Sequence, residues 1–507
     1  MFTFKKVMIV LRAPGAKGAI EAVAPTQRVL SRDLDKTKPS QNESDPVENV
    51  TGFSPQTKKR RLDRWLDGFV RLSGSEAAFI VILLGLLAWA FLGISFGQAP
   101  EWAILISDIQ AIVSYIYDSL LMRQQLNSYD QLIRTSASLR SRSLSQQAML
   151  RAILRSGRYK TIDPTHFESQ RHGEFTAALP TENLVGRIST LFSYVLGHIV
   201  TVAFFWVGIF VWIGFGHSMG WSNTWQLYIN SATSALMVFI FSFLANIRER
   251  HAAYMERCLN VIFEVDSTIE LKLRTITGYV IPNPTVIVPA PKMGRIQRCI
   301  FYYADIIGTL VGIAILIVVI VVWVCIGPAM EFNSNWWLLI GTYAGLVGLN
   351  DGFVLRNVQA CLNDYESNAF DGVSLQDKSI MMDTGIPEVE AEQVRMNQLN
   401  YRLSNRMGIV CASEITVILG AVLVISLVIG SSAMKWTETG QLLCNVPPSI
   451  IESFFMMILI TGHNISDAQR RVDLHNMYQR RMRLLSYVDR LEEVEVVKAV
   501  ESKANLD

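Results

Sequence analysis

Residues 304–327, ADIIGTLVGIAILIVVIVVWVCIG, decide the fold of this chain. The run has one charged residue, Asp305, at its start, and it is otherwise apolar, small or uncharged. About 20 such residues cross the hydrocarbon core of a bilayer as a helix. Because an open chain in lipid satisfies its own backbone polar groups only as a helix, the run predicts a membrane-spanning helix.

Seven further apolar runs lie on either side of it. Together the predicted spans cover 78–96, 101–122, 195–215, 225–246, 304–327, 336–356, 409–430 and 441–462. They pair as hairpins, because the two members of a pair are joined by a short turn whereas long polar links join one pair to the next. The predicted fold class is therefore all-α: a polytopic membrane protein with eight transmembrane helices in four repeated helical hairpins.

This pairing divides the chain into segments. Residues 1–61 are polar and end in a basic cluster, so we expect a disordered cytoplasmic tail there. The predicted hairpin repeats cover 62–122, 184–275, 293–365 and 401–490. Cytoplasmic links at 123–183 and 366–400, a link at 276–292 and a C-terminal tail at 491–507 make up the rest.

Composition agrees with a membrane protein. Half of the 507 residues are apolar and 18% are charged, against about a quarter charged in soluble domains. The short turns contain a single cation, Lys435, whereas the first long link is rich in arginine. Lys and Arg collect on the cytoplasmic side of spanning helices. Both termini are therefore predicted to be cytoplasmic, and the basic segments indicate topology rather than nucleic-acid binding.

The residues that several classes of protein require for their function are absent from this sequence. The six cysteines are scattered, with no spacing typical of a disulfide framework or a zinc knuckle. The sequence has no phosphate-binding GxxxxGK[ST] loop and no GxSxG nucleophile elbow. Only His198 falls in a predicted span, so no histidine pair is available for haem. We predict no enzyme and no cofactor, which leaves a channel or a carrier.

Internal repeats group the polar residues of the spans. Three turns share a pattern that begins Met219-Gly-Trp221-Ser, Met330-Glu-Phe332-Asn and Met434-Lys-Trp436-Thr. A small residue followed by a polar one is predicted to open the first helix of every hairpin: Ser75-Glu76, Gly197-His198, Ala304-Asp305 and Ser413-Glu414. Four copies of one hairpin account for both patterns.

An ionisable residue inside a span costs about 2.5 to 3.5 kcal/mol on insertion scales, so each one needs a reason. Aligning the repeats places Asp118, Asp351 and Glu452 within about one helical turn of each other in equivalent helices. Such a ring supplies hard oxygen ligands to a divalent cation. The alternative is that these acids form structural ion pairs with Arg123 and Arg356, or interhelical hydrogen bonds.

Two further sets have weaker support. Glu76, His198, Asp305 and Glu414 are a candidate inner metal site, but an acid in the first turn of a helix also complements its dipole. On the opposite side Glu101, Glu331 and Glu438 form an acidic rim that would concentrate cations, unless they are simply solvated turn charges.

The run Trp221-Ser-Asn-Thr-Trp-Gln-Leu-Tyr-Ile-Asn230-Ser-Ala-Thr233, with Asn246-Ile-Arg248 further on, resembles the low-affinity iron permease family. The likeness is closest over 184–275, and the hairpins from 62 to 490 agree with the fungal members. It implies a plasma-membrane transporter of ferrous iron that tolerates copper, zinc, manganese and cadmium. Asn230 and Asn246 match the family run, although the second hairpin lacks the acid present in the other three.

The predicted function is low-affinity uptake of Fe²⁺, with Zn²⁺, Cu and Mn²⁺ as further substrates, across the lipid bilayer of the plasma membrane. The inside-negative potential contributes roughly 4.6 kcal/mol per 100 mV for a divalent ion. The alternatives are a membrane receptor or scaffold that transports nothing, and a channel of other selectivity. Metal preference and oligomeric state are left open.

Overall fold

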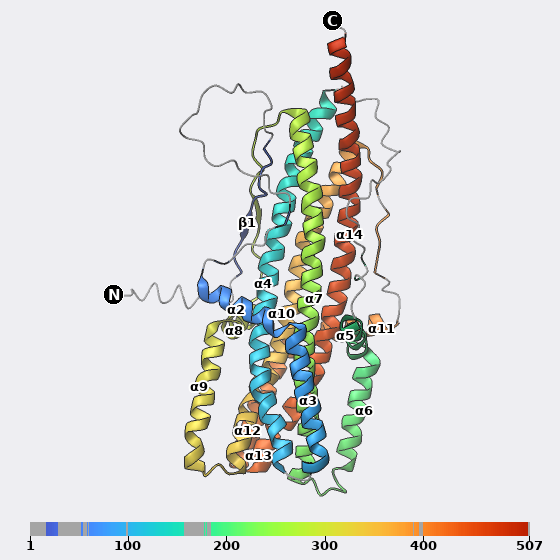
Figure 1. Ribbon diagram of the computed structural model, residues 1–507. Coiled ribbons are helices and arrows are strands. Elements are labelled where there is room, and N and C mark those ends of the chain that lie inside the picture. The colour runs from blue at the N-terminus through green and yellow to red at the C-terminus, as the bar shows by residue number, and fades with distance from the viewer. Residues whose placement is uncertain are drawn as a thin grey trace, which may run out of the picture.

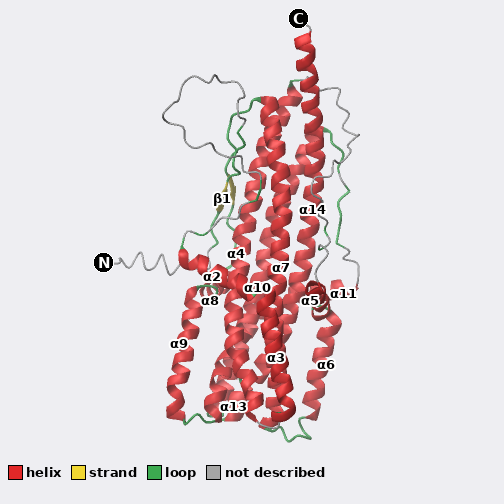
Figure 2. Cartoon of the chain, in the orientation of Figure 1, coloured by secondary structure: helices red, strands yellow, loops and turns green. Residues whose placement is uncertain are grey.

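The computed structural model describes residues 17–28, 52–53, 58, 60–97, 100–156, 177, 179, 184–388, 390–394 and 399–504. Within these residues the chain is nearly all helical (Figure 2).

Four long helices form a central bundle: α4 (Pro100–Arg155), α7 (Asn223–Thr277), α10 (Ser334–Thr384) and α14 (Val446–Ala504). α4 packs on α7 and α10, and α14 packs on the same two helices. At 1.5 Å per residue each helix is about 75 Å long or more, over twice the thickness of a hydrocarbon core. The bundle therefore has a membrane half, surrounded by shorter helices, and a distal half that projects beyond them (Figure 1).

Four shorter apolar helices stand around the membrane half: α3 (Glu76–Phe96), α6 (Ile199–Phe215), α9 (Leu310–Ile326) and α12 (Glu414–Ala433). Their large apolar side chains are exposed, as in Phe91, Phe204 and Val318, which requires an apolar surrounding such as lipid. By length and composition seven of the described helices are able to cross a membrane, or eight if the bent pair α5–α6 counts as one span.

A short helix precedes each of these outer helices: α2 (Arg61–Ser73), α5 (Leu184–Leu196), α8 (Arg295–Ile307) and α11 (Leu399–Cys411), each of 13 residues. They lie near the level at which the distal half begins (Figure 1). The chain breaks after each one, and between α5 and α6 it bends by 63°. The residues that open the next helix cap it, because the side chains of Ser75, His198, Thr309 and Ser413 accept backbone N–H bonds.

This break corrects the fifth predicted span, the first of the third hairpin. Residues 304–327 are not one helix: α8 ends at Ile307 and α9 begins at Leu310, with Thr309 as its cap. Asp305 therefore lies inside α8 and does not open the span, and Gly308-Thr309 occupies the place assigned to Ala304-Asp305. The apolar run continues across the break, so hydropathy gave no sign of it. The predicted span 441–462 is likewise divided, between α13 (Glu438–Leu443) and α14.

Three hairpin turns share one backbone conformation. Two consecutive residues are left-handed in each, at Gly220 and Trp221, Glu331 and Phe332, and Lys435 and Trp436. The second residue is aromatic. In the first two of these turns its ring packs on Gly216 or Gly327, where an added Cβ would lie 2.4 Å from a ring atom. These glycines are therefore required for the turn. The 3₁₀ helix η1 (Gly327–Met330) leads into the second of the three turns.

Part of the N-terminal segment is ordered. β1 (Ile20–Ala22) pairs antiparallel with β2 (Val286–Val288), and both lie on α4. The backbone N–H of Gln27 bonds to the buried Glu270 carboxylate at 3.1 Å. The expectation of a disordered tail over 1–61 is therefore wrong for residues 17–28, and most of the remaining tail lies outside the described residues.

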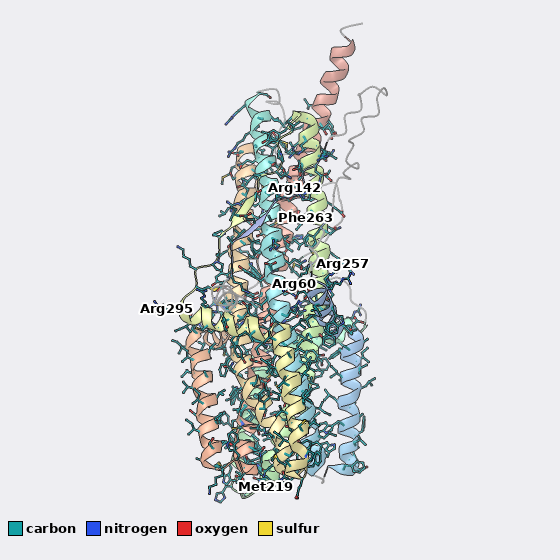
Figure 3. All side chains as sticks on the ribbon, turned by 90° about the vertical axis from the view of Figure 1, so that its left-hand side faces the viewer. Arg60, Arg142, Met219, Arg257, Phe263 and Arg295 are labelled. Carbon is teal, nitrogen blue, oxygen red and sulfur yellow. The ribbon has the colours of Figure 1, made fainter. Side chains whose placement is uncertain are left out.

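The distal half buries charges in pairs. Arg142 lies over the ring of Phe263 (Figure 3) and binds Glu270 at 2.9 Å, as Arg274 also does. One turn earlier on α7, Asp266 is bound at 2.6 Å by Arg481 of α14, which also lies 2.8 Å from Asp377.

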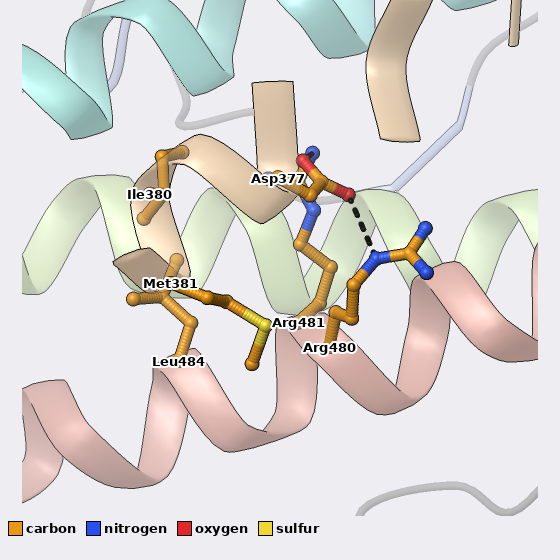
Figure 4. Close-up of a pocket in the computed structure, with 6 residues that line it drawn as sticks. All are labelled: Asp377, Ile380, Met381, Arg480, Arg481 and Leu484. Carbon is orange, nitrogen blue, oxygen red and sulfur yellow. Dashed lines mark ion pairs between the residues drawn. The ribbon is translucent and has the colours of Figure 1, made fainter. Parts of the chain in front are cut away.

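Arg480 lies 3.8 Å from Asp377, beside a cavity of about 10 Å³ (Figure 4). Burial raises the pKa of Asp377 to about 6, although both arginines oppose the shift. The distal half therefore uses its buried acids to hold four helices together.

Candidate metal path

A column of buried polar side chains runs through the membrane half of the central bundle. All four long helices contribute, and we call this set the polar column: Ser107, Gln110, Ser114, Asp118, Asn230, Thr233, Ser234, Thr342, Asp351, Asn445, Ser449, Glu452 and Ser453. On α4 its members recur at i, i+3, i+7 and i+11, which places them on one helix face. The other long helices of the bundle cover this face.

The outer part of the column is a hydrogen-bonded network between helices. Asn230 of α7 donates to the Ser107 hydroxyl of α4 at 2.9 Å, and the hydroxyls of Thr233 and Ser449 lie 2.9 Å apart. Asn445, at the break before α14, donates to Thr342 of α10 at 3.3 Å. These amides and hydroxyls are oxygen-rich groups of the kind that replace water around a hard cation.

The three predicted acids lie deeper in the column. Asp118 and Asp351 are both about 25 Å from the starts of their helices, at 1.5 Å per residue. Glu452 lies against Gly348, where a Cβ would be 2.7 Å from either carboxylate oxygen. Each acid is 1% exposed, and the charge of Asp118 interacts with those of both Asp351 and Glu452. The structure therefore brings the predicted set into one buried region.

Most of the oxygens of these acids have no partner among the described residues. Both oxygens of Asp118, both of Glu452 and Oδ2 of Asp351 lack a hydrogen bond. The exception is Oδ1 of Asp351, which accepts a 2.5 Å bond from the Tyr303 hydroxyl of α8. A buried carboxylate without a hydrogen-bond partner is costly, so we expect these groups to bind a proton or a cation.

The alternative of structural ion pairs with arginine does not hold. Arg123 binds Asp67 of α2 at 2.7 Å and lies 3.4 Å from Asp63. Arg356 donates to Gln359 at 2.8 Å and to the Gly408 carbonyl at 2.9 Å. Both arginines extend away from the acids, toward the short helices or the distal half. Of the alternatives only an interhelical hydrogen bond, from Tyr303 to Asp351, is present.

The acids are close but not yet in ligand geometry. Across the described part of the chain, no group of three or more His, Cys, Asp or Glu is positioned to hold a metal ion. A cation would therefore have to draw the carboxylates inward.

The candidate inner set is dispersed. Glu76 and Glu414 lie in the first turns of α3 and α12, where an acid complements the helix dipole. His198 caps α6, with Nδ1 accepting from the Val200 N–H at 3.3 Å. Asp305 pairs with Lys17 at 3.2 Å. The structure does not bring these four together. Three of them have roles at helix starts: Glu76 and Glu414 complement the helix dipole, and His198 caps α6.

The predicted outer rim lies on the opposite side of the membrane half, at the hairpin turns. Glu331 is exposed in its turn, and Glu438, in the first turn of α13, accepts a bond from Asn223 at 3.2 Å. The side chain of Glu101 lies outside the described residues.

Sequence reasoning missed most of the column. Ser107 and Asn445, for example, were not proposed. Nor were two residues outside the column: Tyr303, and Asp108, which is buried with Oδ2 lacking a partner among the described residues. The helical spacing of hydroxyl and amide residues would have found those on α4 and α14. Tyr303 had no such signal, because α8 was read as part of the third hairpin rather than as a separate helix.

Apolar helices around a polar, acid-bearing interior define a polytopic membrane protein. The family model for low affinity iron permease matches residues 185–270 and 400–505. The low-affinity iron/zinc ion transport protein fet4 of Schizosaccharomyces pombe is 34% identical over 95% of this chain and 85% of its own length. The low-affinity Fe(2+) transport protein of Saccharomyces cerevisiae is 34% identical over 84% of this chain and 83% of its own length.

This chain therefore belongs to the low-affinity iron permease family, as its sequence predicts. Members of the family are transporters and not enzymes. No solved structure matches the chain.

Proposed function

We propose that this chain takes up ferrous iron, and other divalent metals such as zinc, at low affinity across the plasma membrane, through the polar column. The observation that carries the proposal is the cluster of buried, unpartnered carboxylate oxygens on Asp118, Asp351 and Glu452. Two relatives of the chain are named for iron or iron/zinc transport, which gives the substrate class.

The proposed topology is eight spans in four repeated hairpins, with the distal half and both termini in the cytoplasm. The shared turn conformation and the four capped outer helices support a repeat. The distribution of basic residues supports this orientation. In the described turns the one Lys or Arg residue is Lys435, whereas the distal half carries many arginines.

In the proposed mechanism a hydrated cation is attracted by the acidic rim and enters the column near Asn230. Amide and hydroxyl oxygens replace part of its water, so that dehydration is gradual. At Asp118, Asp351 and Glu452 the ion neutralises charges that are otherwise buried without partners. A membrane potential adds roughly 4.6 kcal/mol per 100 mV for a divalent ion, so no nucleotide is needed.

The test is flux into proteoliposomes at a set potential, with the purified full chain. We expect saturable entry of Fe²⁺ that Zn²⁺ inhibits, no chloride flux, and abolition of Fe²⁺ entry by Asp351→Ala with Glu452→Ala. Asp305→Asn is the matched control, because Asp305 lies outside the column. Normal Fe²⁺ entry in the double variant would reject the path, and no metal entry in the unaltered chain would reject transport.

A further inference from the structure

A seam between α10 and α14 continues from the acids toward the distal half. On α10 it follows Gly348, Gly352 and Arg356, which recur at every fourth residue along one face. Glu452 contacts the first of these positions, and the side chain of Phe455 lies 3.5 Å from where a Cβ at Gly352 would be. Gly348 lets the Glu452 carboxylate approach α10 closely, whereas a Cβ at Gly352 would make only ordinary contacts.

The seam ends in a cavity of about 310 Å³ between α10, α11 and α14. Its lining mixes polar and apolar residues and includes Arg356, Cys361, Asn363, Asp364, Asn405 and Ser466. Asp364 and Asn405 are exposed, so the cavity reaches the surface. A cation leaving the acids along this seam would arrive here.

The side chain of Arg356 stands between the acids and the cavity. It extends from α10 to α14, where a Cβ at Gly462 would lie 2.6 Å from Nη1. It also donates a hydrogen bond to the Gly408 carbonyl of α11. It is 7% exposed, and Nε has no hydrogen-bond partner within the described residues. No carboxylate of the described chain pairs with it, although Asp364 lines the same cavity.

A buried guanidinium without an acid is costly, as a buried acid without a cation is. Arg356 is also five residues beyond Asp351 on the same helix, about 7.5 Å along the axis. A fixed positive charge at that position repels a divalent ion that tries to leave the acids. An ion at the acids in turn repels Arg356, and the nearest acid in the cavity to which it can move is Asp364.

We propose that Arg356 is the inner gate of the path: it closes the α10–α14 seam, and a divalent cation bound at the acids drives it toward Asp364. This inference rests on the proposed function, because it assumes that a cation passes Glu452. It makes Arg356 a residue that controls exit, and the cavity the vestibule through which the ion leaves.

The first test is Fe²⁺ flux in proteoliposomes of Arg356→Gln, Arg356→Lys and Arg402→Gln, an exposed arginine of α11 as the matched control. Arg356→Gln should raise the flux about tenfold, which corresponds to about 1.4 kcal/mol off the barrier. Arg356→Lys and Arg402→Gln should remain near the unaltered chain. Flux in Arg356→Gln at or below that of the unaltered chain, at equal amounts of folded protein, would overturn the gate.

The second test does not depend on iron transport. Gly352→Cys introduces a thiol behind the gate, in a space where its Cβ makes ordinary contacts of 3.5 Å or more. A cationic methanethiosulfonate reagent is added to vesicles with the vestibule side outward, and the modification at position 352 is measured by mass spectrometry. Its rate should rise with Arg356→Gln, whereas Cys361, which lines the vestibule itself, should react equally in both chains.

Equal rates at position 352 in the two backgrounds would overturn the gate even if Fe²⁺ flux is present. A faster rate in Arg356→Gln without Fe²⁺ flux in any chain would support the gate and reject the proposed substrate.

Discussion

The two halves of the central bundle use the same four helices and bury their acids in opposite ways. In the distal half Glu270 is held by two arginines, and Asp266 by Arg481. In the membrane half both Asp118 and Glu452 lack any hydrogen bond to the described residues. The acids are equally buried, so burial alone does not distinguish a structural acid from one proposed to bind a transported ion. The presence or absence of a paired arginine does.

The difference has opposite consequences for stability. Removing one member of a buried pair leaves an uncompensated charge, whereas neutralising an unpaired buried acid removes one. Substitutions in the two halves should therefore change stability in opposite directions.

The largest effect is expected from Glu270→Gln in the distal half. It leaves Arg142 and Arg274 without their acid, and breaking such buried pairs costs roughly 3 to 5 kcal/mol. Thermal unfolding of the purified chain in detergent measures the loss. The exposed Glu264→Gln on the same helix is the control and should leave the midpoint unchanged. Equal midpoints for the two variants would show that the pairs are not structural.

The reverse experiment is Glu452→Gln in the membrane half. The neutral amide should leave the unfolding midpoint unchanged or raise it, because it removes an unpaired buried charge. Fe²⁺ flux should fall by about 100-fold, corresponding to about 2.7 kcal/mol of lost ion stabilisation. A variant that loses stability and keeps its flux would make Glu452 a structural acid like Glu270.

A third substitution separates the position of the acid from its charge. In Gly348→Ala the new Cβ would lie 2.7 Å from the Glu452 oxygens, so the carboxylate must move. Such overpacking costs roughly 1 to 3 kcal/mol, and Fe²⁺ flux should fall although every acid is retained. Gly352→Ala, one turn further, meets only contacts of 3.5 Å or more and should behave as the unaltered chain. Equal flux in the two alanine variants would contradict the placement of Glu452.

The sequence predicted the part of the fold that hydropathy controls. The outer helices were found because runs such as 414–433 are apolar on all sides, as a lipid-facing helix must be. The break at Thr309 and the extent of the long helices were missed. The break at Thr309 was missed because the residues on both sides of it are apolar. The length of the long helices was missed because the polar residues beyond each span were interpreted as links, although they continue the helix.

The same limit applies to the site. Asp118, Asp351 and Glu452 were proposed from the sequence because a charge in an apolar run is conspicuous, and repeats suggested their depth. The sequence did not show whether a buried acid has a basic partner. By its spacing Arg123 was a possible partner for Asp118, but in the structure it binds Asp67 of a different helix. Pairing depends on contacts between segments far apart in sequence, and such contacts follow from the assembled bundle rather than from local pattern.

The smallest predicted effect concerns pH and the distal half. Burial raises the pKa of Asp377 to about 6 from 3.8, so the folded chain holds this proton more tightly than the unfolded chain does. Lowering the pH from 7 to 5 should therefore stabilise the fold by about 1 kcal/mol through this group, and the gain should be lost as the pH rises through 6. Asp377→Asn removes the titrating group and should therefore flatten this part of the pH profile. Unfolding midpoints of the two chains at pH 5, 6 and 7 give the comparison. Parallel profiles would show that Asp377 is already charged at pH 5, held so by its arginines as the other distal acids are.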